Sequence, residues 1–257
     1  MTDFHPPSGA GRGRIALCLA IAAVFVYLGA LLLVESQWAV GALLLLSVLA
    51  MLGARRLGWS NTLGAAAGDS PRVLGVGCAL GVLGLAAVFH DSHFALLLVC
   101  TVLLFAVVCL GLNVQFGYAG VVNFAGAAFF GVGSYTAATL ATHTSLPHAL
   151  VLIAGGAAAA AIGSLLIWPV LRTRGHYAAL VTIAFGILFK SFLEVNDTLG
   201  GPQGLRIPAM NLFGWRLGDG FEVAGVEFSF YFNYLLLSLG LCAAAFVFVR
   251  RIERSWI

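Results

Sequence analysis

Eight long apolar runs constrain this chain more than any other feature of its sequence. Each approaches the roughly 20 apolar residues that a helix needs to cross the hydrocarbon core of a bilayer. Hydrophobic residues make up 61% of the 257 residues and charged residues only 9%, against about 25% charged residues in ordinary soluble domains. The sequence therefore predicts an all-α, polytopic transmembrane helix bundle of about eight spans. This composition excludes a soluble enzyme, a disordered chain and a nucleic-acid-binding module. The predicted spans are 15–34, 39–54, 73–89, 94–112, 121–141, 149–171, 176–193 and 231–249.

The arginines predict how these spans are oriented. With the N-terminus in the cytoplasm, eight crossings place Arg206 and Arg216 outside and all other arginines inside. This distribution agrees with the positive-inside rule, so both termini are predicted to be cytoplasmic. The arginines predicted to lie inside are Arg12, Arg14, Arg55, Arg56, Arg72, Arg172, Arg174, Arg250, Arg251 and Arg254.

The spans divide the chain into three regions. Residues 1–14 form a cytoplasmic tail, residues 15–94 form additional N-terminal transmembrane helices, and residues 95–257 form a transmembrane core. The first span has no small-residue cleavage site after it and is predicted to be a retained helix rather than a signal peptide. An outer loop, 195–229, shows no obvious regular element, and loops of this length are usually functional or disordered.

The cysteines and histidines predict neither disulfides nor a metal site. The five cysteines lie scattered inside apolar runs, which is typical of small hydrophobic side chains in helices. Four histidines fall on the predicted outer side, but they come from different loops and lack a pattern of supporting carboxylates. These histidines are His90, His93, His143 and His148.

The segment 111–135, GLNVQFGYAGVVNFAGAAFFGVGSY, is the most informative part of the chain. It combines amide side chains with glycines that break helical regularity. An interrupted helix at membrane depth is tolerated only where protein or a water-filled cavity receives the freed backbone groups. Two interpretations stay open: this segment lines a polar pathway, or it is an interfacial connection followed by a glycine-rich packing helix.

Lys190 and Glu194 are the charged pair of the seventh span. Residues four apart share a helix face and can pair. A charge inside a span points to function by default, although a lysine near a helix end can also extend its ammonium group to the interface. Both a structural role and a role in substrate passage or partner docking are therefore considered.

Several catalytic motifs are absent from the sequence. There is no G-x-x-x-x-G-K-[ST] phosphate-binding loop, no H-E-x-x-H and no G-x-S-x-G. The sequence therefore gives no support for an enzyme. For a glycine-rich bundle with few charges, we predict a role in transport.

Three motifs, in this order, resemble the permease subunits of branched-chain amino-acid ABC transporters, of the LivM type. The first is GLNVQFGYAG followed by FAGAAFFGVGSYTAATL, the second is PVLRTRGHYAALVTIAFGILFK at 169–190, and the third is LGGPQGL at 199–205. The similarity covers roughly 96–257. It identifies 95–257 as the transmembrane core of an ABC permease.

The resemblance implies a division of labour among several proteins. A periplasmic binding protein delivers the amino acid, two permease subunits form the path, and two cytoplasmic ATPase subunits bind and hydrolyse ATP. This chain would then need no cofactor of its own and would lie in a bacterial inner membrane. The outer loop would dock the binding protein through Asp219, Glu222 and Glu227.

The chain also departs from the pattern of that family. The closing RRIERSWI resembles the entry to the cytoplasmic coupling loop, so the core is expected to be incomplete at its C-terminal end. A fragment, a truncated gene and a contribution from another chain all stay open. Lys190 stands where the family has arginine, and the segment 122–126 differs from the family's usual residues after the GYAG turn.

Other functions compatible with the residues are a urea or short-amide ABC permease, a secondary transporter and a degenerate membrane subunit. A secondary transporter would show two matching broken helices in related halves, and only one glycine-rich segment is evident. The residues predicted to line the substrate path carry an amide, hydroxyl, glycine or charge in or beside a span. They are Asn113, Gln115, Gly117, Tyr118, Gly120, Asn123, Gly126, Tyr135, Thr182 and Lys190.

Overall fold

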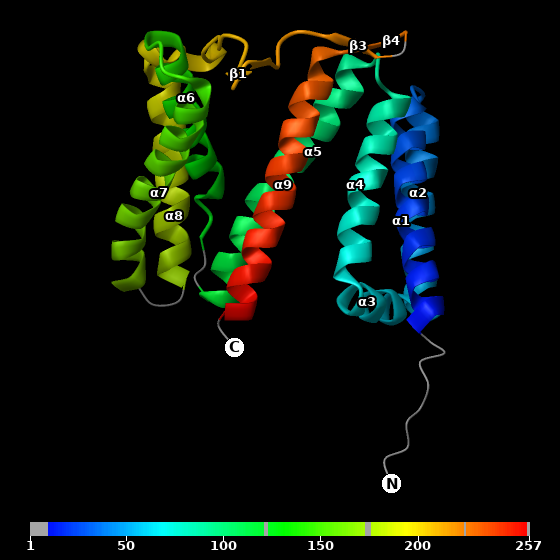
Figure 1. Cartoon of the computed structure of the whole chain (residues 1–257). Coiled ribbons are helices and arrows are strands. Elements are labelled where there is room, and N and C mark those ends of the chain that lie inside the picture. The colour runs from blue at the N-terminus through cyan, green and yellow to red at the C-terminus, as the bar shows by residue number, and fades with distance from the viewer. Residues whose placement is uncertain (1–9, 121–122, 173–175, 224, 256–257) are drawn as a thin grey trace. The chain divides into compact units, whose positions relative to one another are not determined.

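The computed structural model describes residues 10–120, 123–172, 176–223 and 225–255. The chain is almost entirely helical (Figure 1) and divides into two compact units, Met1–Val99 and Cys100–Ile257. The prediction of an all-α polytopic bundle is confirmed. Arg174, predicted to lie inside, falls outside the described residues.

The described part of the first unit contains α1 (Ala10–Leu33), α2 (Gln37–Arg56), α3 (Trp59–Asp69), α4 (Pro71–Val88) and the start of α5 (His93–Asn113). Two of the glycines of α4, Gly77 and Gly81, face α1. A Cβ added at Gly77 would lie 2.9 Å from the Ile21 side chain, and one at Gly81 would collide with the Phe25 ring. Apolar side chains from α1 therefore fill the space that these glycines leave, as expected for close helix packing in lipid.

The second unit contains α5 (His93–Asn113, which begins in the first unit), η1 (Val114–Tyr118), α6 (Gly126–His143), α7 (His148–Arg172), α8 (His176–Val195) and α9 (Phe230–Ser255). Helices α6 and α7 approach most closely at glycines. A Cβ at Gly155 of α7 would lie 2.7 Å from the Gly133 carbonyl oxygen of α6. Phe129 of α6 packs on Phe185 of α8, with ring centroids 5.8 Å apart.

The helices carry apolar side chains on their outer surfaces as well as at their contacts. Helix α2 has no buried residue, and leucines such as Leu45 are 62% exposed. A helix that is apolar all round suits a lipid environment rather than water. Seven helices among the described residues are long and apolar enough to cross a membrane.

Each of the eight predicted ranges overlaps a helix, but α6 begins only at Gly126, later than the predicted span 121–141, and it is not among the seven apolar spans. Its 18 residues include Gly131, Gly133, Ser134 and several threonines, which lower its hydropathy. The number of crossings and the cytoplasmic termini stay predictions. The structure adds one helix that the apolar pattern did not predict, the 11-residue α3. Figure 1 shows it lying across one end of α1, α2 and α4.

The outer loop contains regular structure, contrary to the expectation from its sequence. It begins with two short 3₁₀ turns, η2 (Asp197–Leu199) and η3 (Gly201–Gln203). It continues with two antiparallel hairpins, one formed by β1 (Asn211–Leu212) and β2 (Trp215–Arg216), the other by β3 (Phe221–Val223) and β4 (Val226–Phe228). Strands of two or three residues are too short to show a recognisable alternation of apolar and polar residues in the sequence.

The contact between α6 and α7 generates a prediction with a matched control. Gly155→Ala should lower the thermal midpoint of the detergent-solubilised protein, because its Cβ would collide with the Gly133 backbone and overpacking costs about 1–3 kcal/mol. Gly156→Ala meets no atom within 4 Å and should be neutral or stabilising. Fluorescence-detected size-exclusion after heating measures both variants. Equal midpoints would contradict a close helix contact at Gly155.

Candidate functional site

The helix that begins as α5 ends in an irregular connection to α6. After Asn113 the backbone widens into the π-helical turn η1, and Gly120 then adopts a left-handed conformation with φ of +62°. A π-helical turn inside or beside an α-helix is rare and is frequently found at functional sites. The interruption predicted within 111–135 is therefore present. Val121 and Val122 lie outside the described residues.

Three of the predicted path residues form one polar network around this connection. The Asn123 amide nitrogen donates to the Gln115 side-chain oxygen at 2.8 Å, while the Asn123 oxygen accepts from the Ala125 backbone nitrogen at 2.8 Å. The Thr182 hydroxyl of α8 accepts from the Phe124 backbone nitrogen at 3.1 Å. The same hydroxyl lies within hydrogen-bonding distance of the Ala178 and Ala179 carbonyl oxygens.

Two members of this network are buried, with Asn123 8% and Thr182 2% exposed, while Gln115 is half-buried. The bonds of the network satisfy backbone N–H groups that the break in the helix leaves without helical partners. Buried donors must be paired, above all at membrane depth, where water is not available. In this chain Asn123 and Thr182 thus hold the irregular segment against α8. The network therefore combines predicted path residues with a structural role.

Four other predicted path residues lie on the exposed side of the same connection. Asn113, Gly117, Tyr118 and Gly120 are all exposed, with the Asn113 side-chain oxygen next to Gly117. The Tyr118 side chain lies close enough to the Glu253 carboxylate of α9 for the two to interact. Gly126 begins α6 and lies beneath the Leu112 side chain. The connection thus joins elements that are far apart in the sequence.

Tyr135 and Lys190 are not part of this network. Tyr135 lies in the middle of α6, half-buried, and Lys190 lies near the end of α8. The Lys190 ammonium group is 3.5 Å from the Glu194 carboxylate, and both side chains are more than half exposed. The pairing predicted from their spacing is confirmed. An exposed pair of this kind contributes little to stability.

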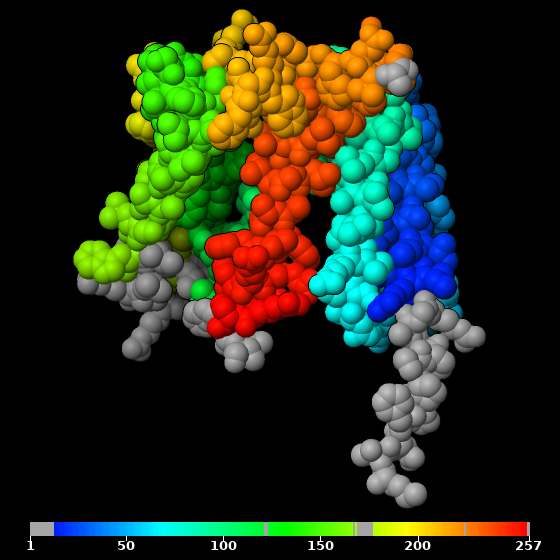
Figure 2. Space-filling model, viewed as in Figure 1, coloured from blue at the N-terminus to red at the C-terminus, as the bar shows by residue number. Residues whose placement is uncertain are grey.

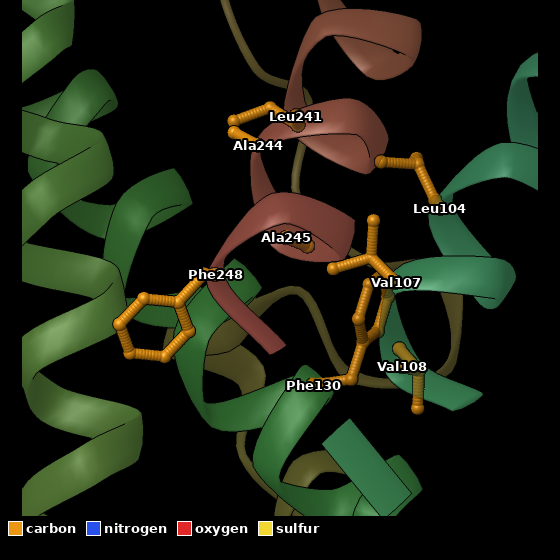
Figure 3. A pocket seen from close by; sticks show the side chains of 8 residues that line it. All are labelled: Leu104, Val107, Val108, Phe130, Leu241, Ala244, Ala245 and Phe248. Atoms are coloured by element: carbon orange, nitrogen blue, oxygen red, sulfur yellow. The ribbon is translucent and has the colours of Figure 1, made fainter. Parts of the chain in front are cut away.

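A cavity of about 440 Å³ lies between α5, α6 and α9, and its walls are entirely apolar (Figure 3). It contains none of the predicted path residues. An amino-acid zwitterion needs partners for its ammonium and carboxylate groups, which this cavity does not offer. The cavity is lined by Leu104, Val107, Val108, Phe130, Leu241, Ala244, Ala245 and Phe248.

The outer loop is held on the first turns of α9. The Asn233 amide donates to the Asp219 carbonyl oxygen at 2.9 Å, and the Tyr234 hydroxyl accepts from the Met210 nitrogen at 3.4 Å. Leu217 is completely buried. Figure 2 shows this segment, gold to orange, as a surface at the end of the second unit where α9 begins.

The β3–β4 hairpin presents two different faces. Phe221 and Phe228 stack with centroids 5.2 Å apart, and both rings contact Phe232 of α9. Glu222 lies directly opposite Glu227 in the register and therefore on the other face of the hairpin, where both are exposed. The third predicted docking residue, Asp219, lies 3.9 Å from Arg216.

The β1–β2 hairpin supplies a residue that sequence reasoning missed. Phe213 occupies its two-residue turn with φ of +52°, and 97% of its surface is exposed. Such turns prefer Asn or Gly because both central residues need positive φ. Nothing in the sequence distinguishes Phe213 from the many phenylalanines of the spans.

A second cavity, also of about 440 Å³, lies between this hairpin and the turn that connects α6 to α7. His148 contributes to its wall, and its Nε2 atom is buried without a hydrogen-bond partner among the described residues. In the same described part of the chain, no disulfide joins any of the five cysteines and no cluster of three metal-ligating side chains is present.

Comparison with known proteins identifies the family. The family model described as "Branched-chain amino acid transport system / permease component" matches residues 93–252, more than half of the chain. The chain belongs to this family. It is a family of transport permeases and not of enzymes. The second unit falls almost entirely within the match, while residues 1–92 lie outside it.

Two curated relatives carry the same description. The chain is 38% identical over 138 residues to the "High-affinity branched-chain amino acid transport system permease protein LivM" of Escherichia coli (strain K12). It is 36% identical over 138 residues to the protein of the same name from Salmonella typhimurium. Each alignment covers 53% of this chain and about a third of the relative, 32% of its length. No solved structure matches the chain significantly.

The bond between Thr182 and Phe124 generates the second prediction. Thr182→Val should lower the thermal midpoint, because the Phe124 N–H would lose its partner on the buried Thr182 side chain, and an N–H left unpaired on burial costs about 1–3 kcal/mol. Thr139→Val is the control, because the Thr139 hydroxyl bonds only the Tyr135 carbonyl oxygen of its own helix. Thermal scans of both variants in detergent make the comparison. A Thr182→Val shift no larger than that of Thr139→Val would show that the hydroxyl does not hold the segment.

Proposed function

We propose that the chain is an integral-membrane permease subunit of an ABC importer for branched-chain amino acids, and that it forms part of the translocation path. The observation that carries the proposal is membership of the permease family over 93–252, together with 36–38% identity to two LivM permeases. The seven apolar spans agree with a multi-pass membrane protein. The membrane proposed is the bacterial inner membrane.

The proposal assigns energy coupling to other subunits. The sequence contains no phosphate-binding loop, so ATP would be bound by two cytoplasmic ATPase subunits. A second permease subunit would complete the path, and a periplasmic binding protein would deliver the amino acid. This chain itself needs no cofactor for that role.

The break between α5 and α6 is the proposed location of the path. Polar backbone and amide groups lie there beside a membrane-spanning helix, while the adjoining walls are apolar. A branched-chain amino acid needs both surfaces: polar groups for its charged ends and apolar walls for its side chain. The ten predicted path residues stay a proposal. Among them, Gln115, Asn123 and Thr182 also have the structural duty described above.

Reconstitution tests the energy source. Proteoliposomes that hold the chain with its second permease and ATPases should take up radiolabelled leucine only with binding protein outside and ATP inside. Vanadate should abolish this uptake, because it blocks ATP hydrolysis by the partner subunits. Uptake driven by a proton or sodium gradient without ATP would instead support a secondary transporter. Uptake of urea in preference to leucine would support the short-amide permease.

The outer loop is the proposed docking surface for the binding protein. Glu222 and Glu227 lie side by side on the exposed face of the β3–β4 hairpin, whose other face is fixed on α9 by three aromatic rings. Like charges directly opposite each other destabilise a hairpin. A partner with basic side chains would relieve that repulsion. The exposed Phe213 ring adds an aromatic anchor of the kind found in interfaces.

Charge reversal on the hairpin tests this surface. Glu222→Lys should weaken binding of the purified binding protein about five- to tenfold at low salt, with a smaller effect at high salt. The hairpin itself should survive, because the substituted side chain would face the Glu227 carboxylate across the strands. Asp197→Lys, with the same charge change elsewhere in the loop, is the control. Binding is measured by surface plasmon resonance on protein in nanodiscs.

Phe213→Asn tests the aromatic anchor separately. Asparagine is favoured at this turn position, so the hairpin should be retained while the ring is lost. Unchanged binding by both Phe213→Asn and Glu222→Lys would place docking elsewhere on the chain.

A further inference from the structure

Most of the first unit, residues 1–92, lies outside the family match, and the charges of this unit are distributed unequally between its two ends. The structure describes the side chains of four arginines at the end where α3 crosses the bundle: Arg14 near the start of α1, Arg55 and Arg56 in the last turn of α2, and Arg72 in the first turn of α4. Among the described residues at this end, Asp69 is the only acidic one. At the opposite end the charged residues are Glu35 and Asp91.

These arginines are available for a ligand. All four are exposed. Within the part of the chain that the structure describes, none of them forms an ion pair, since the pairs found are His90–Asp91, Lys190–Glu194 and Arg216–Asp219. Exposed guanidinium groups without carboxylate partners can form bidentate bonds to phosphate oxygens.

Helix α3 gives this end a fixed shape. Its Leu63, Ala66 and Ala67 are half-buried, whereas Ser60, Asn61 and Gly64 are exposed. A Cβ added at Gly13 of α1 would lie 3.6 Å from the Ala66 Cβ, in ordinary van der Waals contact. The apolar side of α3 thus covers the helix ends and its polar side faces outward.

One arginine is positioned by a specific bond. The Arg14 Nε donates to the Ser70 hydroxyl at 3.1 Å, and Ser70 is only 8% exposed. Ser70 lies at the junction of α3 and α4, two residues before Arg72. This bond connects the start of α1 to the start of α4 and holds the Arg14 guanidinium beside the junction.

The position of these arginines along the membrane normal indicates which kind of ligand they bind. The arginines flank apolar helices of 18 to 24 residues, so they lie where the hydrocarbon core ends and the phosphates begin. Leu57 and Trp59, in the connection beside Arg56, are 70% and 61% exposed, as is typical of side chains at a lipid interface. Charge, depth and exposed apolar groups fit a lipid headgroup better than a folded protein.

We propose that the α3 end of the first unit binds the phosphate headgroups of anionic phospholipids, through Arg14, Arg55, Arg56 and Arg72. Basic clusters at the ends of transmembrane helices bind such headgroups by the same combination of charge and interfacial depth. The first unit thereby anchors this chain in a leaflet rich in anionic lipid, a role separate from the translocation path.

Native mass spectrometry of the full-length chain tests the proposal. The delipidated protein in detergent is titrated with dioleoylphosphatidylglycerol and, in parallel, with dioleoylphosphatidylcholine. The unaltered chain should retain phosphatidylglycerol preferentially. The triple variant Arg55→Gln, Arg56→Gln, Arg72→Gln should bind phosphatidylglycerol at least about tenfold more weakly. Each arginine near an anionic surface contributes a factor of about five to the affinity.

The control removes equal charge elsewhere. Lys190→Gln combined with Arg206→Gln and Arg216→Gln should leave phosphatidylglycerol retention within about twofold, because these residues lie in the second unit. An equal loss in both triple variants would mean that only net charge matters and would overturn the proposal. Retention of phosphatidylglycerol by the first variant would also overturn it.

Two further measurements do not depend on that variant. Ser70→Ala removes no charge but frees Arg14, and should reduce phosphatidylglycerol retention more than Ser60→Ala, whose hydroxyl is exposed. Phosphatidylglycerol, but not phosphatidylcholine, should raise the thermal midpoint of the unaltered chain. Equal stabilisation by both lipids would contradict headgroup recognition. Displacement of the lipid by millimolar inorganic phosphate would indicate a free-anion site instead.

Discussion

In a bilayer every backbone N–H and C=O must find its partner within the protein, and the rest of this structure depends on that constraint. It explains why most of the described residues are helical and why the strands found among them lie in the outer loop. It also explains the polar residues near the break between α5 and α6. There the backbone leaves the helical pattern, and the side chains of Asn123 and Thr182 bond the nitrogens that the helix no longer serves. The polar network is thus first a structural necessity, and any contact with a substrate must be compatible with that duty.

In lipid there is no hydrophobic driving force between helices, so their association depends on close van der Waals packing of complementary surfaces. In both units the closest approaches involve glycines: Gly77 and Gly81 receive side chains of α1, and Gly133 and Gly155 let α6 and α7 meet backbone to backbone. The same principle leaves an apolar cavity between α5, α6 and α9, where the contacts are looser. A permease must combine helices that fit tightly with others that do not, and this chain contains both kinds of contact.

The sequence predicted the helices well because each span leaves a long apolar run that needs no tertiary information. It did not predict α3, since 11 residues containing Gly64 and Gly68 show neither the length nor the apolar content of a span. It did not predict the hairpins, whose strands are too short to alternate. For the site, the amides and glycines of 111–135 were found from their residue types. The bond from Thr182 to the Phe124 nitrogen joins positions 58 apart, and the contact of Tyr118 with Glu253 joins η1 to the last helix. Such pairs depend on how helices pack, which one sequence does not specify.

The unequal charge of the first unit gives it an electric dipole along the direction of its helices. Arginines occupy one end, while Glu35 and Asp91 occupy the other. A membrane potential acts on such a dipole, with about 2.3 kcal/mol for each elementary charge moved through 100 mV. If the arginine end faces the negative side, inverting the unit would move several charges of both signs against the field at once. The voltage across the membrane would then oppose inversion of this unit continuously, in addition to the barrier that the lipid itself presents.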